Sequence, residues 1–200
     1  MYLKYPYWYF QKALSDKICD DIIATGKSAR KINALTGKAK KITPAVQKKR
    51  KSNVSWLNHK WIYNEIHPFI HTANKNAGWN FDWDWSESCQ FTIYKPGQFY
   101  DWHCDSWIEP YNKPGCPTHG KQRKLSVTVS LSDPKDYKGG ELEFSNVNHY
   151  DGKLNKIVCK EILPRGSIVV FPSHIWHRVK PVKKGIRYSL VIWNLGWPFK

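Results

Sequence analysis

Residues 166–173 read GSIVVFPS, and this stretch carries the pattern that decides the fold. A glycine turn precedes four apolar residues, three of them β-branched, and a proline follows. A short apolar run that is bounded by turn residues and rich in β-branched side chains is typical of a buried strand. The stretch therefore predicts a strand over Ser167–Phe171 in the interior of a β-sheet.

Segments of similar character lie on both sides of this strand. The predicted strands are, in chain order, Ser88–Tyr94, Tyr100–His103, Lys124–Leu131, Glu141–Phe144, Ile157–Leu163, Ser167–Phe171 and Arg187–Trp193. Turn pairs such as Pro96-Gly97 and Gly139-Gly140 separate them. Many short strands at this spacing favour a sandwich or barrel, so we expect a mainly β fold of the jelly-roll kind.

Two helices are predicted before these strands. The first begins at Ser15 and ends near Gly26, with apolar residues spaced for one buried face. From residue 54 to about residue 77 apolar residues recur at intervals of three and four, which predicts a second helix, bent or interrupted near Pro68. The stretch between them, residues 27–52, has little apolar periodicity and is predicted to be a long basic loop.

The chain has the size and composition of one compact domain. Its 200 residues are 41% hydrophobic, which is enough to bury a core and excludes a globally disordered chain. We expect residues 1–87 to form a helical region that braces one sheet, and residues 88–200 to form the jelly-roll core.

Positive charge dominates the chain, with a formal net charge of +16. Much of it lies in the basic segment Lys27–Lys51, which contains no Asp or Glu. Such a segment attracts nucleic acid, an acidic protein or an anionic small molecule, and it is also typical of a solvated arm. The charge alone does not choose between these partners.

Cysteine usage and hydropathy predict a cytoplasmic location. The five cysteines form no C-x-x-C pair, and the first ten residues do not resemble a signal peptide. We therefore expect free thiols in a reducing compartment. No apolar run approaches the roughly 20 residues that a membrane helix needs, so no membrane partner is expected.

A candidate metal site begins with His103 and Asp105. In an extended segment residues i and i+2 point to the same face, so an imidazole and a carboxylate would project together. An H-x-D pair alone is weak support, because such pairs arise easily by chance. A histidine beyond the strand Ser167–Phe171, either His174 or His177, would complete a set of two histidines and one carboxylate, which leaves coordination sites of iron open.

Arg187 opens the last predicted strand, ten residues after His177. A buried arginine needs an anionic partner, and the planar fork of its donors matches a carboxylate. The alternative is an ordinary ion pair between Arg187 and an acidic residue at the edge of the sheet.

Several short motifs together resemble a known family. They are YKPG at 94–97, HCD at 103–105, RKLS at 123–126, GGEL at 139–142, FPS at 171–173, HRV at 177–179 and GIR at 185–187. Their order and spacing resemble the prolyl 4-hydroxylase-like branch of the 2-oxoglutarate/iron(II) dioxygenases, and most of all the bacterial and phage PKHD-type hydroxylases. The resemblance covers about Ser88 to Trp193. The HRV match and the spacing to Arg187 favour His177 over His174 as the second histidine.

The resemblance implies a double-stranded β-helix with an iron(II) ion bound by His103, Asp105 and His177. Arg187 would bind the distal carboxylate of 2-oxoglutarate. Tyr94 would donate a hydrogen bond to this cosubstrate.

Trp193 lies on the same face of its strand as Arg187 and would form a wall of the pocket. For both aromatic residues, Tyr94 and Trp193, ordinary core packing is the alternative.

The implied reaction is the hydroxylation of an unactivated C–H bond with O2, giving succinate and CO2, with ascorbate as a candidate reductant. A prolyl residue in a protein or peptide is the expected substrate. The alternatives are nucleic acid, attracted by residues 27–51, a free amino acid, and a jelly-roll that binds without catalysis. The aromatic residues Trp102, Trp107 and Tyr111 could hold a proline ring or stack on a base.

Overall fold

The computed structural model describes residues 3–34, 41, 43–147 and 154–199, and β-strands dominate among them. The larger sheet has the strand order β1 (Trp8–Phe10), β12 (Ile168–Pro172), β8 (Gln122–Ser130), β15 (Arg187–Gly196), β6 (Cys89–Tyr94), β4 (Asn53–Leu57), β2 (Ile32–Asn33), and β5 (Trp85–Ser86) also pairs with β15. The smaller sheet has the order β11 (Leu154–Val158), β10 (Leu142–Val147), β13 (Trp176–Val179), β7 (Phe99–His103), β3 (Arg50–Lys51). Two further strands, β9 (Tyr137–Gly139) and β14 (Val182–Gly185), pair with each other.

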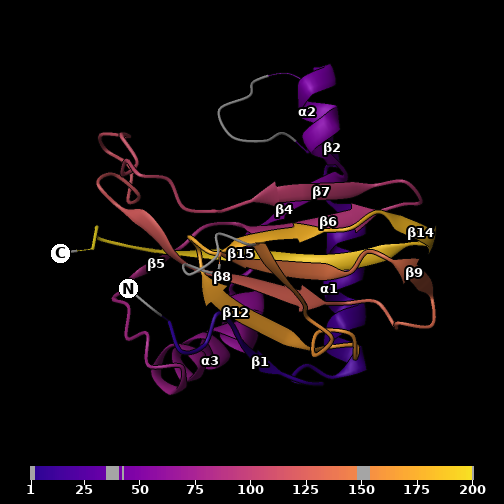
Figure 1. Cartoon of the computed structure of the whole chain (residues 1–200), viewed down its shortest axis with the longest axis horizontal. Helices are drawn as coiled ribbons and strands as arrows, with labels where there is room; N and C mark the ends of the chain where they lie inside the picture. The colour runs from indigo at the N-terminus through magenta and orange to yellow at the C-terminus, as the bar shows by residue number, and fades with distance from the viewer. Residues whose placement is uncertain (1–2, 35–40, 42, 148–153, 200) are drawn as a thin grey trace.

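The principal strands alternate between the two sheets along the chain. Strands β6, β8, β12 and β15 belong to the larger sheet, and β7, β10 and β13 belong to the smaller one. In Figure 1 helix α2 lies at the top of the view, apart from the other two helices. This alternation produces a double-stranded β-helix, so the predicted jelly-roll is confirmed.

Strand β12 is buried on both of its faces, as its apolar run predicts. Ile168 and Val170 pack in a hydrophobic cluster with residues of the helices α1 (Asp16–Ser28) and α3 (Lys60–Asn76). Val169 and Phe171 point the other way, into a second cluster that includes residues of the smaller sheet. The larger sheet therefore has helices on one face and the smaller sheet on the other.

Helix α1 begins where the sequence predicts. The Ser15 hydroxyl caps it by accepting a hydrogen bond from the backbone N–H of Ile18 at 3.3 Å. The buried residues Cys19, Ile22 and Gly26 follow one face. A methyl group at Gly26 would overlap the Phe91 ring on β6, so the glycine allows the helix to lie close to the sheet.

The second predicted helix was wrong at its start. Residues 53–57 form β4, which pairs with β6, and α3 begins only at Lys60. The helix continues through Pro68, which lies on its exposed side. Four buried residues hold the opposite side against the sheet: Ile62, Ile66, Ile70 and Ala73.

The prediction of one long loop over residues 27–52 was also wrong where the structure describes it. The segment contains the end of α1, β2, the short helix α2 (Pro44–Lys49) and β3. Thr43 caps α2 by accepting a hydrogen bond from the N–H of Val46 at 3.2 Å, and Pro44 occupies the first turn, where its missing N–H costs little. Residues 35–40 and 42 of this segment lie outside the described ranges.

Other boundaries shift by a few residues. The predicted strand Ile157–Leu163 ends at Val158, and a turn follows. The N-terminal region supplies β1, β2 and β4 to the larger sheet in addition to its helices. Among the described residues, no helix is both long enough and apolar enough to cross a membrane.

Candidate metal centre

His103 and His177 face each other across two strands of the smaller sheet. His103 is the last residue of β7, His177 lies on β13, and the two residues pair in register. Their ring centroids are 4.1 Å apart. The hydrogen-bonded sheet therefore fixes the distance between the two imidazoles.

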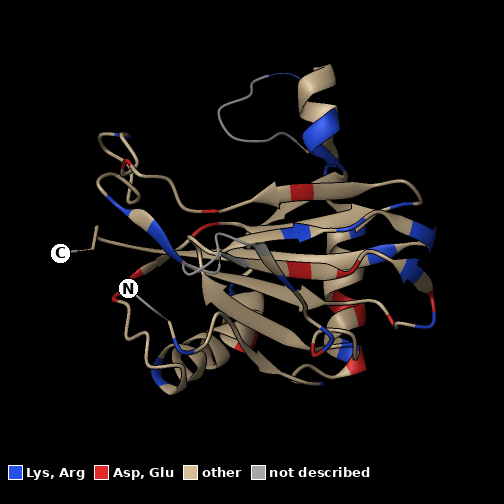
Figure 2. Cartoon of the chain, in the orientation of Figure 1, with Lys and Arg blue, Asp and Glu red and all other residues tan. Residues whose placement is uncertain are grey.

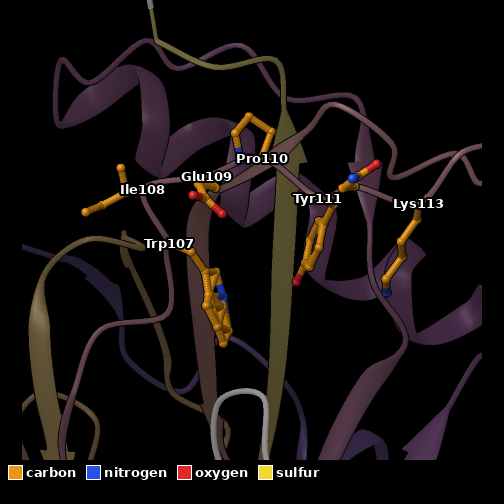
Figure 3. A pocket seen from close by; sticks show the side chains of 7 residues that line it. Trp107, Ile108, Glu109, Pro110, Tyr111 and Lys113 are labelled. Carbon is orange, nitrogen blue, oxygen red and sulfur yellow. The ribbon is translucent and has the colours of Figure 1, made fainter.

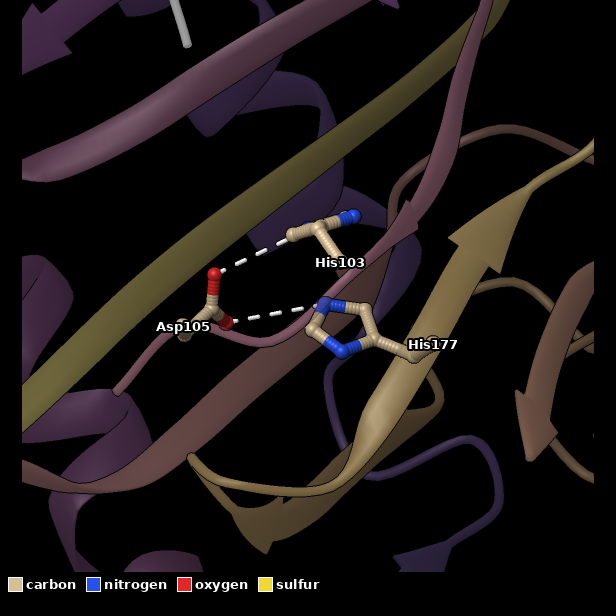
Figure 4. Close-up of side chains that lie close together, drawn as sticks. All are labelled: His103, Asp105 and His177. Atoms are coloured by element: carbon tan, nitrogen blue, oxygen red, sulfur yellow. Dashed lines mark ion pairs between the residues drawn. The ribbon is translucent and has the colours of Figure 1, made fainter. Parts of the chain in front are cut away.

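Asp105 follows β7 and points toward both rings (Figure 4). Its Oδ1 lies 3.7 Å from His103 Nε2, and its Oδ2 lies 3.6 Å from His177 Nε2. Nitrogen and oxygen atoms of the three side chains that could bind a metal all lie within 4.8 Å of one another. Two imidazoles and one carboxylate at this separation suit a divalent transition metal.

The far nitrogens of both rings are held by backbone carbonyls. His103 Nδ1 donates to the carbonyl oxygen of Asp101 at 2.7 Å, and His177 Nδ1 donates to that of Ile175 at 3.0 Å. Because a carbonyl can only accept, each Nδ1 carries a proton, and each Nε2 faces Asp105. Such partners fix the tautomer and the ring orientation of a metal-binding histidine.

The Asp105 carboxylate is oriented by buried hydroxyl groups. Ser126 Oγ donates to Asp105 Oδ2 at 2.7 Å and lies 2.9 Å from Ser173 Oγ, while the backbone N–H of Asp105 donates to the carbonyl oxygen of Ser173 at 2.8 Å. Burial opposes ionisation of Asp105, but the neighbouring imidazoles of His177 and His103 lower its pKa to about 2. Burial, followed by the proximity of His177, lowers the pKa of His103 to about 3. Both groups are therefore deprotonated near neutral pH, which is the form that binds a metal.

His174, the alternative to His177, is exposed and does not join this group of three. The structure thus brings together the three residues that the motifs selected.

Arg187 lies in the same interior, at the start of β15 and opposite Tyr94 in register. It is only 2% exposed, and its Nη1 donates to Ser189 Oγ at 3.3 Å. Its guanidinium carbon lies 5.5 Å from the centre of the Tyr94 ring. In the part of the chain that the structure describes, Arg187 forms no ion pair with a carboxylate. A buried guanidinium without such a partner fits an anionic ligand.

A narrow pocket joins Arg187 to the metal-site residues, and Tyr94 and Trp193 also line it. Its volume is about 30 Å³, which is room for no more than a few water molecules. The chemistry of the lining fits an anionic ligand such as a dicarboxylate.

Trp193 lies on the Arg187 face of β15, as its even spacing predicts. Its ring is buried, and its indole N–H has no hydrogen-bond partner among the described residues. The Arg123 guanidinium stacks over this ring at 3.9 Å. Trp193 therefore separates the narrow pocket from a second cavity, to which it also contributes.

The second cavity, here called the outer chamber, has a volume of about 340 Å³. It meets the narrow pocket at four shared residues, which are Gln90, Tyr100, Asp105 and Trp193. Its lining also includes Arg50, Trp56, Trp107 and Arg123. Trp107 comes from the loop between β7 and β8, whose residues 107–113 border a further pocket. In Figure 3 the rings of Trp107 and Tyr111 extend from the same side of this loop.

Sequence reasoning missed a stack of three side chains beside the metal site. The Tyr100 ring lies flat on the His103 ring, with centroids 3.5 Å apart and planes 12° apart. The Arg50 guanidinium covers the other face of Tyr100 at 4.4 Å from its centre. Tyr100 was visible only as the start of a strand, and Arg50 was hidden in a run of basic residues.

Sequence reasoning also missed the group around Arg123. Its Nε and Nη2 donate to the two carboxylate oxygens of Glu87 at 3.0 and 2.6 Å. The Tyr111 hydroxyl donates to Glu87 Oε1 at 2.8 Å. The loop that carries Tyr111 is thereby tied to Arg123 beside the metal site. Glu87 stands alone in the sequence, and no local signal marks its role.

Comparisons with known proteins agree with this geometry. A sequence profile of the 2OG-Fe(II) oxygenase superfamily matches residues 89–194, which is more than half of the chain. A PKHD-type hydroxylase of Synechococcus sp. (strain CC9902) is 40% identical over 98 residues, covering 48% of this chain and 36% of that protein. The PKHD-type hydroxylase YbiX of Escherichia coli O6:K15:H31 is 34% identical over 103 residues, covering 52% of this chain and 40% of that protein. The chain thus spans about two fifths of the length of the curated relatives it matches.

Solved structures are similar over nearly the whole chain. The viral collagen prolyl hydroxylase of Paramecium bursaria Chlorella virus-1 superimposes with a TM-score of 0.65 at 21% identity, covering 96% of this chain and 97% of that one. A prolyl-4-hydroxylase of Pseudomonas putida gives a TM-score of 0.62 at 20% identity, covering 96% and 92%. At these levels of sequence identity, the similarity shows a shared fold and no more.

Proposed function

The chain belongs to the 2OG-Fe(II) oxygenase superfamily, and we propose that it hydroxylates a prolyl residue in a protein or peptide. The family uses iron(II), 2-oxoglutarate and O2. The observation that carries the proposal is the convergence of His103, Asp105 and His177 beside the buried Arg187. The PKHD-type hydroxylases among its relatives, and the prolyl hydroxylases among similar structures, favour prolyl hydroxylation.

In this proposal His103, Asp105 and His177 hold the iron. They would supply two nitrogens and one oxygen as ligands, a set that is typical of iron sites that also bind a cosubstrate and oxygen. When iron, 2-oxoglutarate and O2 are bound, they supply the oxidising power that converts a C–H bond to C–OH, with succinate and CO2 as coproducts. The protein itself contributes ligand geometry, an enclosed pocket and the placement of the substrate.

Arg187 and Tyr94 would hold 2-oxoglutarate. The guanidinium matches the distal carboxylate in charge and in donor geometry. The Tyr94 hydroxyl would donate a hydrogen bond to the same ligand, and Trp193 would wall the pocket. Fixing the distal end of the ligand in this way sets its orientation before the reaction begins.

The outer chamber would receive the substrate. It adjoins Asp105 and Trp193, and its aromatic walls suit the packing of a pyrrolidine ring. One of the similar structures is a prolyl hydroxylase of Trichoplax adhaerens in complex with a peptide fragment, which supports a polypeptide substrate here as well.

Mass spectrometry of candidate substrates tests this proposal. The purified protein is incubated with iron(II), 2-oxoglutarate and air, together with a library of proline-containing peptides, with free proline or with oligonucleotides. We expect a mass gain of one oxygen atom on prolyl residues, and its loss in the His103→Ala variant. A product on oligonucleotides alone would contradict a prolyl substrate and favour a nucleic-acid oxygenase.

A further inference from the structure

Arg50 is a buried cation without a counter-ion. It is 5% exposed, and its Nε donates to Ser52 Oγ at 3.0 Å. Its Nη2 is buried and has no hydrogen-bond partner in the described part of the chain, where Arg50 also forms no ion pair. Burying an unpaired charge is strongly unfavourable, and one neutral hydroxyl does not offset this cost.

The position of Arg50 is fixed by aromatic stacking. Its guanidinium lies 4.4 Å from the centre of the Tyr100 ring, and Tyr100 in turn lies flat on His103. A cation over an aromatic face is attracted to it, which orients the guanidinium but does not supply a counter-ion or a partner for Nη2. The stack therefore holds a hydrogen-bond donor of fixed orientation beside the metal site.

Arg50 lines the outer chamber. The other guanidinium in the lining, that of Arg123, is already bound to both oxygens of Glu87. The one carboxylate in the lining, that of Asp105, belongs to the metal site. Helix α2 precedes Arg50 and ends in Lys48 and Lys49, and Figure 2 shows blue on this helix. Arg50 is thus the cation of the chamber that is available to a ligand.

We propose that the outer chamber binds a substrate carboxylate on Arg50, so that the preferred substrate carries an acidic group next to the residue that reacts. This inference rests on the proposed function and names the substrate class of the same site. The carboxylate would complete the hydrogen bonds of a planar donor fork. The walls formed by Trp56, Trp107 and Trp193 would hold the apolar ring beside it.

Two sources supply such a carboxylate. One is the side chain of an Asp or Glu next to proline in a polypeptide. The other is the α-carboxylate of a free amino acid.

Wild-type protein separates these sources with matched substrate pairs. Each peptide has blocked ends and carries a single Glu or a single Gln, placed at one of the two positions before proline or one of the two after it. In the second comparison, L-proline is tested against L-prolinamide. A charge-assisted hydrogen bond corresponds to about a ten- to hundred-fold change in binding, so we expect kcat/KM to favour the acidic member by that factor. A preference within the peptides identifies an acidic side chain, and a preference for proline over its amide identifies a free amino acid.

Variants test whether Arg50 is the partner. In Arg50→Gln the ratio of kcat/KM between the Glu and Gln peptides is expected to fall close to one, and in Arg50→Lys to an intermediate value. Arg30→Gln removes the same charge from an exposed site in the same basic segment and should keep the wild-type ratio. Because each ratio is taken within one variant, a general loss of activity or of folded protein does not change it.

The possible failures are distinguishable. Hydroxylation of Glu and Gln peptides, and of proline and prolinamide, with equal kcat/KM in the wild type would overturn this inference and leave the proposed function intact. A wild-type preference that Arg50→Gln retains would overturn the role of Arg50. Hydroxylation of none of these substrates would count against the proposed prolyl substrate. Reaction with an oligonucleotide alone would mean that the chamber accepts a phosphate in place of a carboxylate, and would overturn the inference.

Discussion

Ser126→Ala removes the hydroxyl group that orients the proposed metal-binding carboxylate. The Ser126 side chain is fully buried, donates to Asp105 Oδ2 at 2.7 Å and shares a 2.9 Å hydrogen bond with Ser173. The substitution leaves a buried carboxylate oxygen and a buried hydroxyl each without a partner. We expect it to weaken both the fold and the binding of metal.

The two losses can be estimated separately. A hydrogen bond to a charged group contributes about 1.5–3 kcal/mol and one between neutral groups about 0.5–1.5 kcal/mol, so the free energy of unfolding should fall by about 2–4 kcal/mol. That is a large part of the roughly 5–15 kcal/mol that stabilises a domain. Loss of such an orienting partner typically lowers metal affinity by about 10- to 100-fold.

Ser55→Ala is the matched control. Ser55 is also fully buried in a strand, but its hydroxyl has no hydrogen-bond partner in the described part of the chain. Removing that hydroxyl should leave stability unchanged or raise it slightly. Urea unfolding at pH 7 measures both variants, and calorimetric titration with a divalent metal measures affinity. If Ser126→Ala and Ser55→Ala changed stability equally and neither changed metal affinity, the assignment of Ser126 would be refuted.

Three other changes test other parts of the structure. Arg187→Lys keeps the charge but loses the planar donor fork, so titration should show 2-oxoglutarate binding weakened by about ten-fold or more; unchanged affinity would count against its proposed role. Burial raises the pKa of Tyr111 to about 12. Its contribution to stability is therefore complete below the pKa of about 10 in the unfolded chain and is lost as pH rises through 12. Unfolding measured at increasing pH should show that Tyr111→Phe loses stability less steeply than the wild type, and equal slopes for the two proteins would contradict this. Gly26→Ala would drive a methyl group into the buried Phe91 ring, so urea unfolding should show a free energy of unfolding that is lower by about 1–3 kcal/mol. A higher free energy of unfolding would mean that the better helix propensity of alanine outweighs the overlap.

Much of the fold could be predicted from hydrophobic periodicity. Strands with a strong apolar run, such as β12, were found because burial on both faces leaves a continuous pattern. Strand β13 was not predicted, because one of its buried positions is His177 rather than an apolar residue. Strand β4 was predicted as part of a helix, because apolar residues three positions apart occur in this strand as well as in helices. The two-residue strands β2, β3 and β5 are too short to leave a pattern.

The candidate site could be predicted where residues are linked by motif spacing. His103, Asp105, His177 and Arg187 belong to motifs that appear in a fixed order, and the structure places them together. Arg50 could not be found, because its burial depends on pairing of β3 with β7 and its neighbours in sequence are exposed or basic. Such contacts arise from the tertiary fold and leave no local signal.

Succinate formation from 2-oxoglutarate, without added substrate, tests the central claim most directly. The wild-type protein should form succinate only when iron(II) is present. His103→Ala should form it at a rate at least about 100-fold lower, because one metal ligand is missing. His174→Ala changes an exposed histidine outside the group of three and should behave as the wild type. Equal rates in the wild type and His103→Ala, or a wild-type protein that neither binds iron nor forms succinate, would contradict the account.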